Sequence, residues 1–384
     1  MTAPARIAVA CSGLGHIQRG IESWAADLAQ ALRSAGADVT LFGGRRAEGV
    51  TALPTLRRTG LGARGPAAVL RHLGGWRYGC GSAYEVEQTS FSLGLWRRVR
   101  DGFDILHVQD PLIAAWLDAA YRTGRSRAKV IYANGTGEDA RVMRRFRYLQ
   151  LLTPTAATDW TPQRPEGQRV FTIPNFIDTN RFTPGDKAAA RARFGLPPDA
   201  TIILTCAAIR RRHKRIDALL VAFAAALNSY GHETMLVVAG GRESDTDALI
   251  AEGTALLGAA VRFLPDVPRD GMPDLYRAAD AFVLGSLYEM FGIVLLEALS
   301  SGLPVLCNDT DDFRAIAGAG ALYCDLGNEE AFARGLLRLA DPAECAPLRV
   351  AGRTHVLRHY SADVVTRAIL GMYDIVQADT FLGR

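Results

Sequence analysis

Residues 279–304, ADAFVLGSLYEMFGIVLLEALSSGLP, are the most informative segment of this sequence. Their opening apolar run has the length of a buried strand and ends at Gly285. A loop that carries Glu289 follows, and a helical pattern then begins near Gly292 and carries Glu297 about one turn later. A helix start leaves its first backbone N–H groups without intrahelical partners, so it can bind an anion such as a diphosphate. The segment therefore predicts a strand, a loop and a helix with a ligand site at the turn.

The two glutamates of this segment indicate a ligand with hydroxyl groups. A carboxylate repels a phosphate, whereas it accepts hydrogen bonds from the hydroxyls of a sugar or a ribose. A strand, a loop and a helix with two solvated glutamates is the alternative interpretation. The spacing of Glu289 and Glu297 by itself leaves both interpretations open.

Outside this segment, apolar runs of strand length alternate with helical patterns. In the first half, a run at 6–11 precedes a helical pattern at 20–36, and in the second half a run at 201–209 precedes one at 217–226. This alternation is typical of βαβ units and parallel sheets. We therefore expect an α/β protein with doubly wound parallel sheets.

The chain is long enough for two domains of ordinary size, since it has 384 residues. A turn-rich segment at 171–186 separates the two alternating halves. We therefore predict one domain over residues 1–177, a second over 178–360 and a last amphipathic helix within 361–384.

Composition excludes several classes of protein. The formal net charge of +4 is too small for the dense basic surface of a nucleic-acid-binding protein, so we expect no nucleic-acid partner. The six cysteines include no C-x-x-C pair and no Cys/His spacing of a zinc site. No apolar stretch reaches the ~18 residues of a membrane span, and the strand-like run near residue 7 argues against a signal peptide. We therefore predict a cytoplasmic location.

The run Glu289-x7-Glu297 resembles the EX7E motif of retaining glycosyltransferases, in particular glycosyltransferase family 4. That family has the GT-B fold, in which two Rossmann-like domains with doubly wound parallel sheets face each other across a cleft. The resemblance implies that the domain over 1–177 binds the acceptor and the domain over 178–360 binds the donor. It also implies that the last helix, within 361–384, crosses back to the first domain. The resemblance implies that Glu289 contacts the donor sugar and that Glu297 contacts the ribose. It also implies that the diphosphate faces the backbone of Phe291, Gly292 and Ile293.

A second resemblance concerns residues 206–223, CAAIRRRHKRIDALLVAF. They resemble the family's strand, loop and helix that bring an arginine and a lysine to the donor phosphates. Lys214 matches the lysine, and the arginine is one of Arg210, Arg211 and Arg212. We favour Arg210 because it directly follows the strand. Such cations stabilise the charge that develops on a leaving diphosphate, whereas a solvated basic loop is the alternative interpretation.

Residues 13–32, GLGHIQRGIESWAADLAQAL, resemble the family's glycine-rich loop and first helix. Gly15 and Gly20 would let this loop approach the donor diphosphate or the acceptor. His16 lies in the same loop and could reach the acceptor, although a loop histidine without a function is the alternative.

The segment DILHVQDP, residues 104–111, resembles one whose second histidine lies near the reacting sugar. That position is Gln109 here, and His107 lies two residues earlier. A glutamine can orient a hydroxyl group but cannot take its proton near pH 7. A protein base at this position is therefore in doubt.

The resemblance implies transfer of a sugar with retention of its anomeric configuration. The diphosphate would leave toward Lys214, Arg210 and the helix start at Gly292, and its phosphate would take the proton of the acceptor hydroxyl. Closure of the domains would exclude water. We favour a UDP-sugar over a GDP- or ADP-sugar as the donor, and expect a small-molecule, glycan or lipid-linked acceptor.

No cofactor is expected. The run Asp309-Thr310-Asp311 resembles the DxD metal motif of another glycosyltransferase fold, but it follows the EX7E helix instead of a donor-binding strand. We therefore predict a reaction that does not depend on a metal ion.

Residues 56–100, rich in arginine and tryptophan, leave three interpretations open. They could contact an anionic lipid surface, form the wall of a small-molecule pocket, or be a solvated basic face.

Two other functions remain as alternatives. One is a nucleotide-sugar epimerase of similar fold, which needs no acceptor. The other is a catalytically silent protein that binds sugar nucleotides, since Gln109 and Ala315 depart from the family pattern.

Overall fold

The structure, a computed structural model, describes residues 5–17, 20–135 and 137–380. The chain divides into two compact units, one formed by Met1–Pro174 with Val365–Arg384 and the other by Asn175–Val364. The sequence places the first boundary at residue 177, three residues after the point where the units divide. It places the second boundary at 360, whereas the chain passes back to the first unit after Val364.

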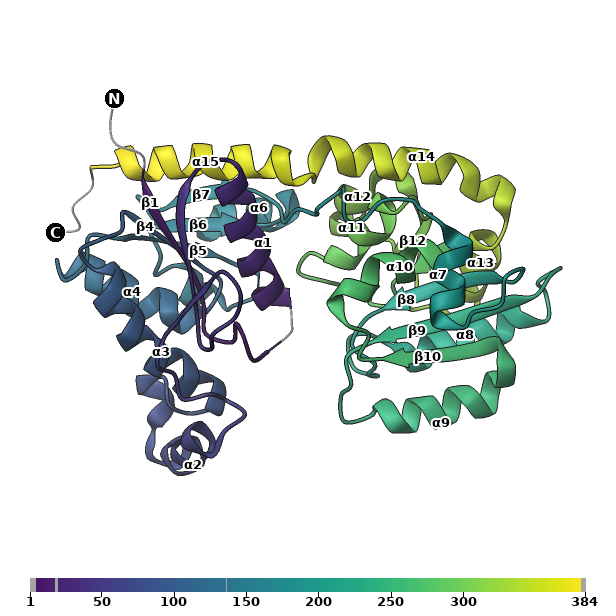
Figure 1. Cartoon of the computed structure of the whole chain (residues 1–384), viewed down its shortest axis with the longest axis horizontal. Helices are drawn as coiled ribbons and strands as arrows, with labels where there is room; N and C mark the ends of the chain where they lie inside the picture. Colours follow the sequence, from purple (N-terminus) through teal and green to yellow (C-terminus); the bar gives the residue numbers. More distant parts are fainter. Residues whose placement is uncertain (1–4, 18–19, 136, 381–384) are drawn as a thin grey trace. The chain divides into compact units, whose positions relative to one another are not determined.

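The first unit is built on a parallel sheet of seven strands in the order β3-β2-β1-β4-β5-β6-β7. The order reverses between β1 and β4, which pair directly with each other (Figure 1). Ligands of such sheets bind at the carboxyl ends of the strands, where the order reverses. The strands are β1 (Arg6–Cys11), β2 (Asp38–Gly43), β3 (Val50–Ala52), β4 (Ile105–Val108), β5 (Lys129–Ala133), β6 (Tyr148–Leu151) and β7 (Arg169–Thr172).

Helices of the first unit bury the apolar residues of this sheet. Leu106 and Val108 of β4 lie in one core cluster with Phe91 and Leu95 of α3 and with Ile113 of α4. The helices are α1 (Gly20–Ser34), α2 (Leu61–Leu70), α3 (Ala83–Val99), α4 (Pro111–Arg122), α5 (Ala140–Met143), α6 (Pro154–Trp160) and α15 (Ala362–Ala378).

The last helix, α15, is fixed to the first unit by polar contacts. The Lys129 ammonium donates to the carbonyl oxygens of Val376 and Gln377 at 2.9 Å. The Tyr373 hydroxyl lies 2.8 Å from Nδ1 of His107 on β4. These bonds explain why the chain's last helix belongs to the same unit as its first strand.

The second unit repeats this architecture with a parallel sheet of six strands in the order β10-β9-β8-β11-β12-β13. The order reverses between β8 and β11, so the carboxyl ends of these two strands are the expected ligand edge. The strands are β8 (Thr201–Cys206), β9 (Thr234–Gly240), β10 (Val261–Pro265), β11 (Ala281–Val283), β12 (Val305–Asn308) and β13 (Ala321–Cys324).

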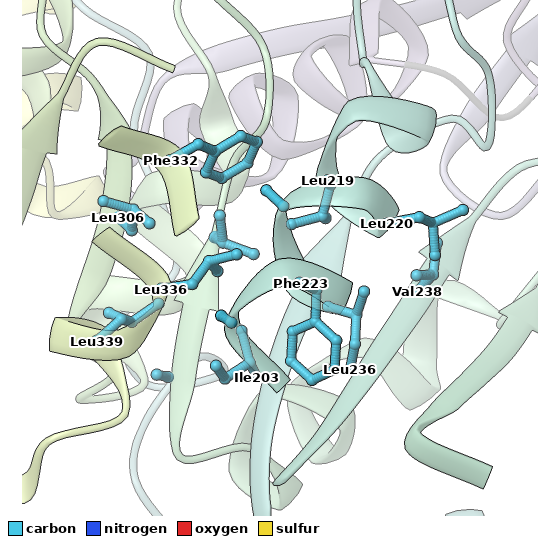
Figure 2. Close-up of a cluster of buried hydrophobic side chains, with 14 of the residues drawn as sticks. Ile203, Leu219, Leu220, Phe223, Leu236, Val238, Leu306, Phe332, Leu336 and Leu339 are labelled. Carbon is cyan, nitrogen blue, oxygen red and sulfur yellow. The ribbon is translucent and has the colours of Figure 1, made fainter. Parts of the chain in front are cut away.

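In the second unit, α8 and α13 pack over strands β8, β9 and β12. Figure 2 shows Leu219 and Phe223 of α8 next to Ile203 and Leu236 of the sheet, with Leu336 of α13 beside them. The helices of this unit are α7 (Lys187–Phe194), α8 (Ile216–Leu227), α9 (Thr246–Leu257), α10 (Met272–Ala278), α11 (Ile293–Ser300), α12 (Asp311–Ala317), α13 (Glu329–Leu339) and α14 (Pro342–His359).

The sequence patterns leave some elements unpredicted. Residues 45–100 form β3, α2 and α3, and the turn-rich segment after residue 171 begins inside β7. Strands β3 and β7 lie at the two edges of the first sheet. Edge strands are short and half exposed, so they lack the continuous apolar run of a central parallel strand.

Candidate active site

The EX7E segment brings a carboxylate against a cation at the carboxyl ends of β8 and β11. Lys214 lies in the loop between β8 and α8, and its ammonium is hydrogen-bonded to Oε1 of Glu289. The two side chains are 18% and 10% exposed, so the pair is shielded from water but reachable by a ligand. The structure thus places together two residues that are 75 positions apart in the sequence.

The loop that carries Lys214 has a strained backbone that is held by hydrogen bonds on both sides. His213 has φ 72° and Arg215 has φ 52°, a conformation that non-glycine residues rarely adopt. Nε2 of His213 lies 3.0 Å from the carbonyl oxygen of Tyr288, and Arg215 donates to the carbonyl oxygen of Leu326 at 2.8 Å. Strain of this kind persists only where contacts over-determine it, as happens at ligand sites.

The three adjacent arginines of this loop have different surroundings. Arg210 has a nitrogen 3.4 Å from Nδ1 of His213, and His213 in turn lies 3.6 Å from the Glu289 carboxylate. Within the described part of the chain, Nε of Arg210 is buried and has no hydrogen-bond partner. Arg211 is paired with Glu252. The Arg210 guanidinium is thus connected through His213 to Glu289, and its Nε keeps a donor for a ligand.

Helix α11 begins beside this pair. Its N-cap is Gly292, which has φ 71° and ψ 56° and makes no side-chain cap. Glycine adopts this left-handed conformation without steric cost, and its lack of a side chain leaves the first N–H groups of the helix accessible. Phe291, just before it, is 4% exposed and packs its ring against Tyr360. The helix start at Gly292 and Ile293 therefore offers N–H groups to an anion.

Glu297 is held by a buried tyrosine. The Tyr276 hydroxyl donates to Oε2 of Glu297 at 2.6 Å. Burial raises the pKa of Tyr276 well above its ordinary value, so its hydroxyl stays protonated and remains a donor. Burial also raises the pKa of Cys206, at the end of β8, which keeps this neighbouring thiol uncharged. Tyr276 thus orients the second glutamate of the motif.

A polar network occupies the corresponding edge of the first unit, between the ends of β1 and β4. Asp110 accepts hydrogen bonds from the Ser12 backbone at 3.1 Å and from the Tyr84 hydroxyl at 2.7 Å. Burial raises the pKa of Asp110 against the opposing effect of these hydrogen bonds. The end of β1 is thereby fixed to the end of β4.

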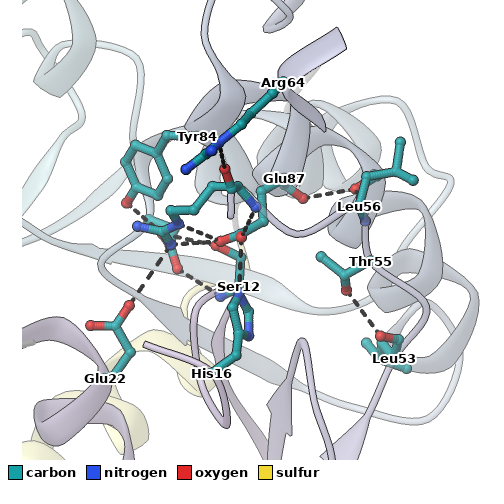
Figure 3. Close-up of polar contacts among 12 residues, drawn as sticks. Ser12, His16, Glu22, Leu53, Thr55, Leu56, Arg64, Tyr84 and Glu87 are labelled. Carbon is teal, nitrogen blue, oxygen red and sulfur yellow. Dashed lines mark hydrogen bonds and ion pairs between the residues drawn. The ribbon is translucent and has the colours of Figure 1, made fainter. Parts of the chain in front are cut away.

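Arg58 lies at the centre of this network. Its guanidinium is 2.6 Å from the Glu87 carboxylate, 3.8 Å from Glu22 and 4.1 Å from the centre of the Tyr84 ring. Glu87 is fully buried and also lies 3.0 Å from Nε2 of His16 (Figure 3). Burial would raise the pKa of Glu87, but the hydrogen bonds from Arg58 and His16 outweigh it and lower the pKa. We refer to Arg58, Glu87 and His16 as the Arg58 network.

The first unit carries His16, predicted on the acceptor side, and Gly15 and Gly20, predicted to bind the donor, and only Gly20 is free of close packing. The His16 side chain is 4% exposed and faces Glu87. Gly15 has φ 90°, and a Cβ there would lie 2.6 Å from the carbonyl oxygen of Arg45, so its own loop requires glycine. At Gly20, the start of α1, a Cβ would meet no other atom within 4 Å, so packing does not require glycine there.

Two residues at the end of β4 differ in what they offer a ligand. His107 packs against Trp24 and Tyr373, and burial lowers its pKa to about 3, so it stays neutral and lies in the core. Gln109 is 3% exposed, and within the described residues its Nε2 has no hydrogen-bond partner. Gln109 therefore retains an N–H donor at the carboxyl end of β4, where ligands of such sheets bind. His107 instead has a structural role.

The DxD-like run is accounted for by local contacts. Asp309 is paired with Arg314, and Asp311 is the first residue of α12. In residues 5–17, 20–135 and 137–380, no group of three or more histidine, cysteine, aspartate or glutamate side chains is arranged to hold a metal ion.

Comparisons with known proteins identify the family. Residues 18–181 match the family model described as Glycosyltransferase Family 4, and residues 186–351 match the one described as Glycosyl transferases group 1. The chain belongs to the glycosyltransferases. The Lys214–Glu289 pair lies on the second of these matched segments, and Arg58 and Glu87 lie on the first.

Curated relatives of this glycosyltransferase share a name. D-inositol 3-phosphate glycosyltransferase 1 of Catenulispora acidiphila is 33% identical over 217 residues, which are 54% of this chain and 51% of the relative. D-inositol 3-phosphate glycosyltransferase 2 of the same organism is 40% identical over 148 residues, 36% of this chain and 34% of the relative. The chain spans about half the length of the curated relatives it matches, or less.

Solved structures show the same fold over the whole chain. Sucrose-phosphate synthase from Thermosynechococcus elongatus has a TM-score of 0.74 at 19% identity, covering 98% of this chain and 100% of that one. Anabaena HepE in complex with UDP-glucose has a TM-score of 0.71 at 14% identity, covering 97% and 100%. The glycosyltransferase therefore has two α/β units of the GT-B type.

Sequence reasoning missed several residues of these sites. His213 stands beside Lys214 in the quoted segment, and only the folded loop shows that it connects Arg210 to Glu289. Arg58 and Glu87 lie within residues 45–100, for which the apolar patterns predict no helix or strand. Asp110 could have been found, because it follows a predicted strand at its carboxyl end, where ligand sites of parallel sheets lie.

Proposed function

We propose that this glycosyltransferase moves a sugar from a UDP-sugar to an acceptor hydroxyl with retention of configuration, in the cytoplasm and without a metal cofactor. One observation carries the proposal: the Lys214–Glu289 pair lies beside the start of α11, and Glu297 follows on the same helix. A cation, free backbone N–H groups and two carboxylates match the groups of a nucleotide-diphosphate sugar, namely its phosphates and its hydroxyls.

In the proposed reaction, each residue acts on one part of the donor. Lys214 and Arg210 stabilise the charge that grows on the diphosphate as it leaves, together with the N–H groups at Gly292. Glu289 accepts hydrogen bonds from the donor sugar, and Glu297 accepts them from the ribose. The acceptor hydroxyl attacks the face from which the diphosphate departs, and its proton passes to the leaving phosphate. No protein base is needed in this scheme.

The names of similar proteins support the proposed classes of donor and acceptor. HepE of Anabaena is described in complex with UDP-glucose, and a trehalose-phosphate synthase from Burkholderia vietnamiensis is described as UDP-forming. The curated relatives are named for D-inositol 3-phosphate. These names favour a UDP-sugar donor and a small polyol or its phosphate as acceptor, before a glycan or a lipid-linked acceptor.

The proposal is tested by measuring nucleotide release. Incubation of the protein with UDP-glucose, GDP-mannose or ADP-glucose should release UDP from the first at a rate that rises when an acceptor such as inositol 3-phosphate is added. Addition of EDTA should leave that rate unchanged, because the charge on the diphosphate is met by Lys214 and Arg210. Proton NMR of the product should show the anomeric configuration of the donor.

Two other outcomes would contradict the proposal. Conversion of the sugar nucleotide into an isomer without an acceptor would identify an epimerase. Binding of UDP-glucose without UDP release, across a panel of polyol, glycan and lipid-linked acceptors, would identify a silent sugar-nucleotide-binding protein.

A further inference from the structure

Residues 49–84 have an unusual charge pattern. They contain five arginines and neither aspartate nor glutamate. One of the arginines, Arg58, is bound by Glu87. The other four are exposed: Arg57, Arg64, Arg71 and Arg77. Arg64 donates to the carbonyl oxygen of Arg58, Arg71 donates to the His72 ring, and among the described residues no carboxylate pairs with either guanidinium. The surface of this segment is therefore basic.

Helix α2, which lies in this segment, packs with its small residues inward. Ala63 and Ala67 are buried against Val86 of α3, whereas Leu61 is 86% exposed and Val69 is 60% exposed. A surface helix of a soluble protein normally turns its large apolar residues toward the core. In Figure 1, α2 lies beyond α3 and away from the strands of its sheet, so no part of that sheet covers its outer face.

The apolar surface continues beyond the helix. Leu73 is 74% exposed, Tyr78 is 71% exposed, and Leu56 before the helix is 46% exposed. We refer to residues 56–78 as the α2 lobe. Single exposed apolar side chains are common on proteins, but several within one short segment mark an interaction surface. The lobe thus combines exposed leucines with exposed arginines and no acidic residue.

We propose that the α2 lobe docks on an anionic lipid surface. Leu61, Val69 and Leu73 would enter the boundary between headgroups and acyl chains, which is where amphipathic helices of peripheral proteins insert their apolar residues. Arg64 and Arg71 would lie against the lipid phosphates, to which arginine binds in a bidentate manner. The absence of carboxylates from residues 49–84 removes the repulsion that an anionic surface would otherwise meet. A neutral protein partner would explain the leucines but not this charge pattern.

This contact lies on the surface of the membrane. No helix in the described ranges combines the length and the apolar character that crossing a bilayer requires. The inference is independent of the donor chemistry, because the α2 lobe belongs to the first unit and the Lys214–Glu289 pair to the second.

Flotation of the full chain with vesicles tests the proposal. With vesicles of phosphatidylcholine and phosphatidylglycerol at low salt, the protein should bind at least about tenfold more tightly than with phosphatidylcholine alone, and added salt should weaken binding. The double variant Leu61→Ser/Leu73→Ser and the double variant Arg64→Gln/Arg71→Gln should each lose most of this binding. Val350→Ser, on α14, is the matched control, because Val350 is also exposed, at 71%, and should bind as the unaltered protein does.

The variants alter exposed side chains, so their thermal unfolding should match that of the unaltered protein. Three results would overturn the proposal. The first is no binding to phosphatidylglycerol vesicles at low salt. The second is full binding by the Leu61/Leu73 variant. The third is a protein that does not bind vesicles but forms a dimer in solution, and whose dimer dissociates in the Leu61/Leu73 variant. That result would show that a second copy of the chain covers the lobe.

Discussion

The Glu289→Gln variant is expected to lower kcat for sugar transfer by about 10²–10³-fold, the usual effect of removing one preorganised electrostatic group from a transition state. In the proposed reaction Glu289 accepts hydrogen bonds from the sugar, and in the structure its carboxylate holds the Lys214 ammonium in place. Glutamine keeps the shape of the side chain but loses the charge that fixes Lys214. Steady-state kinetics with a UDP-sugar donor measures the effect.

The change in donor KM distinguishes this effect from a loss of folding or of general binding. Without the Glu289 carboxylate, Lys214 is free to approach the diphosphate, so the donor KM should stay the same or fall while kcat falls. A variant whose kcat and kcat/KM fall equally, with KM unchanged, has lost an interaction made only in the transition state, whereas a fall in both kcat and KM indicates a loss of ground-state strain. Glu329→Gln, an exposed residue at the start of α13, is the matched control and should retain full activity. Near-normal turnover in Glu289→Gln would refute the assignment of this site.

The Arg58→Met variant is expected to lose about 3 kcal/mol of unfolding free energy. Removing one partner of a buried ion pair costs roughly 3–5 kcal/mol, because the other charge stays buried without compensation. We place the effect at the lower end because the Arg58 side chain is 19% exposed. Urea denaturation measures it, fitted to two transitions because the chain has two compact units. Arg57→Met is the matched control, since Arg57 is adjacent and exposed, and its effect should be small.

The loss in Arg58→Met should depend on pH in a defined direction. Glu87 has a pKa below its ordinary value of 4.5 in the folded protein, so its ion pair contributes fully above that value. The contribution disappears as pH falls through the lowered pKa, because a protonated Glu87 no longer needs a cation. The difference in stability between the unaltered protein and Arg58→Met should therefore be largest near neutral pH and shrink below about pH 4. A difference that stays constant well below that pH would contradict the role of this ion pair.

The sequence predicts the secondary structure of the EX7E segment well, because its strand, loop and helix lie within one short stretch. A strand that ends at Gly285, a glycine at the helix start and a glutamate on the helix are all read from one segment, and the structure has β11, the N-cap Gly292 and Glu297 on α11 in that order. Patterns of apolar residues also predict the central strands, because strands buried on both faces are continuous apolar runs.

The rest depends on contacts between distant residues. His16 and Glu87 are 71 positions apart, and Arg58 and Glu87 are 29 apart, so no spacing rule connects them. The choice among Arg210, Arg211 and Arg212 is likewise a matter of side-chain surroundings, since Glu252 of α9 binds Arg211. Helix α2 was not predicted because its large apolar residues face outward, which removes the pattern expected of a surface helix.

The most direct test of the donor site is the thermal stability of the protein with UDP, GDP and ADP and with their common sugar conjugates. We expect UDP and a UDP-sugar to raise the unfolding temperature, and the Glu297→Ala variant to lose that increase while Glu329→Ala keeps it. A ligand that binds the folded state and not the unfolded state raises the stability of the folded protein. No stabilisation by any of these nucleotides, or full stabilisation of Glu297→Ala, would contradict a nucleotide-sugar site at α11.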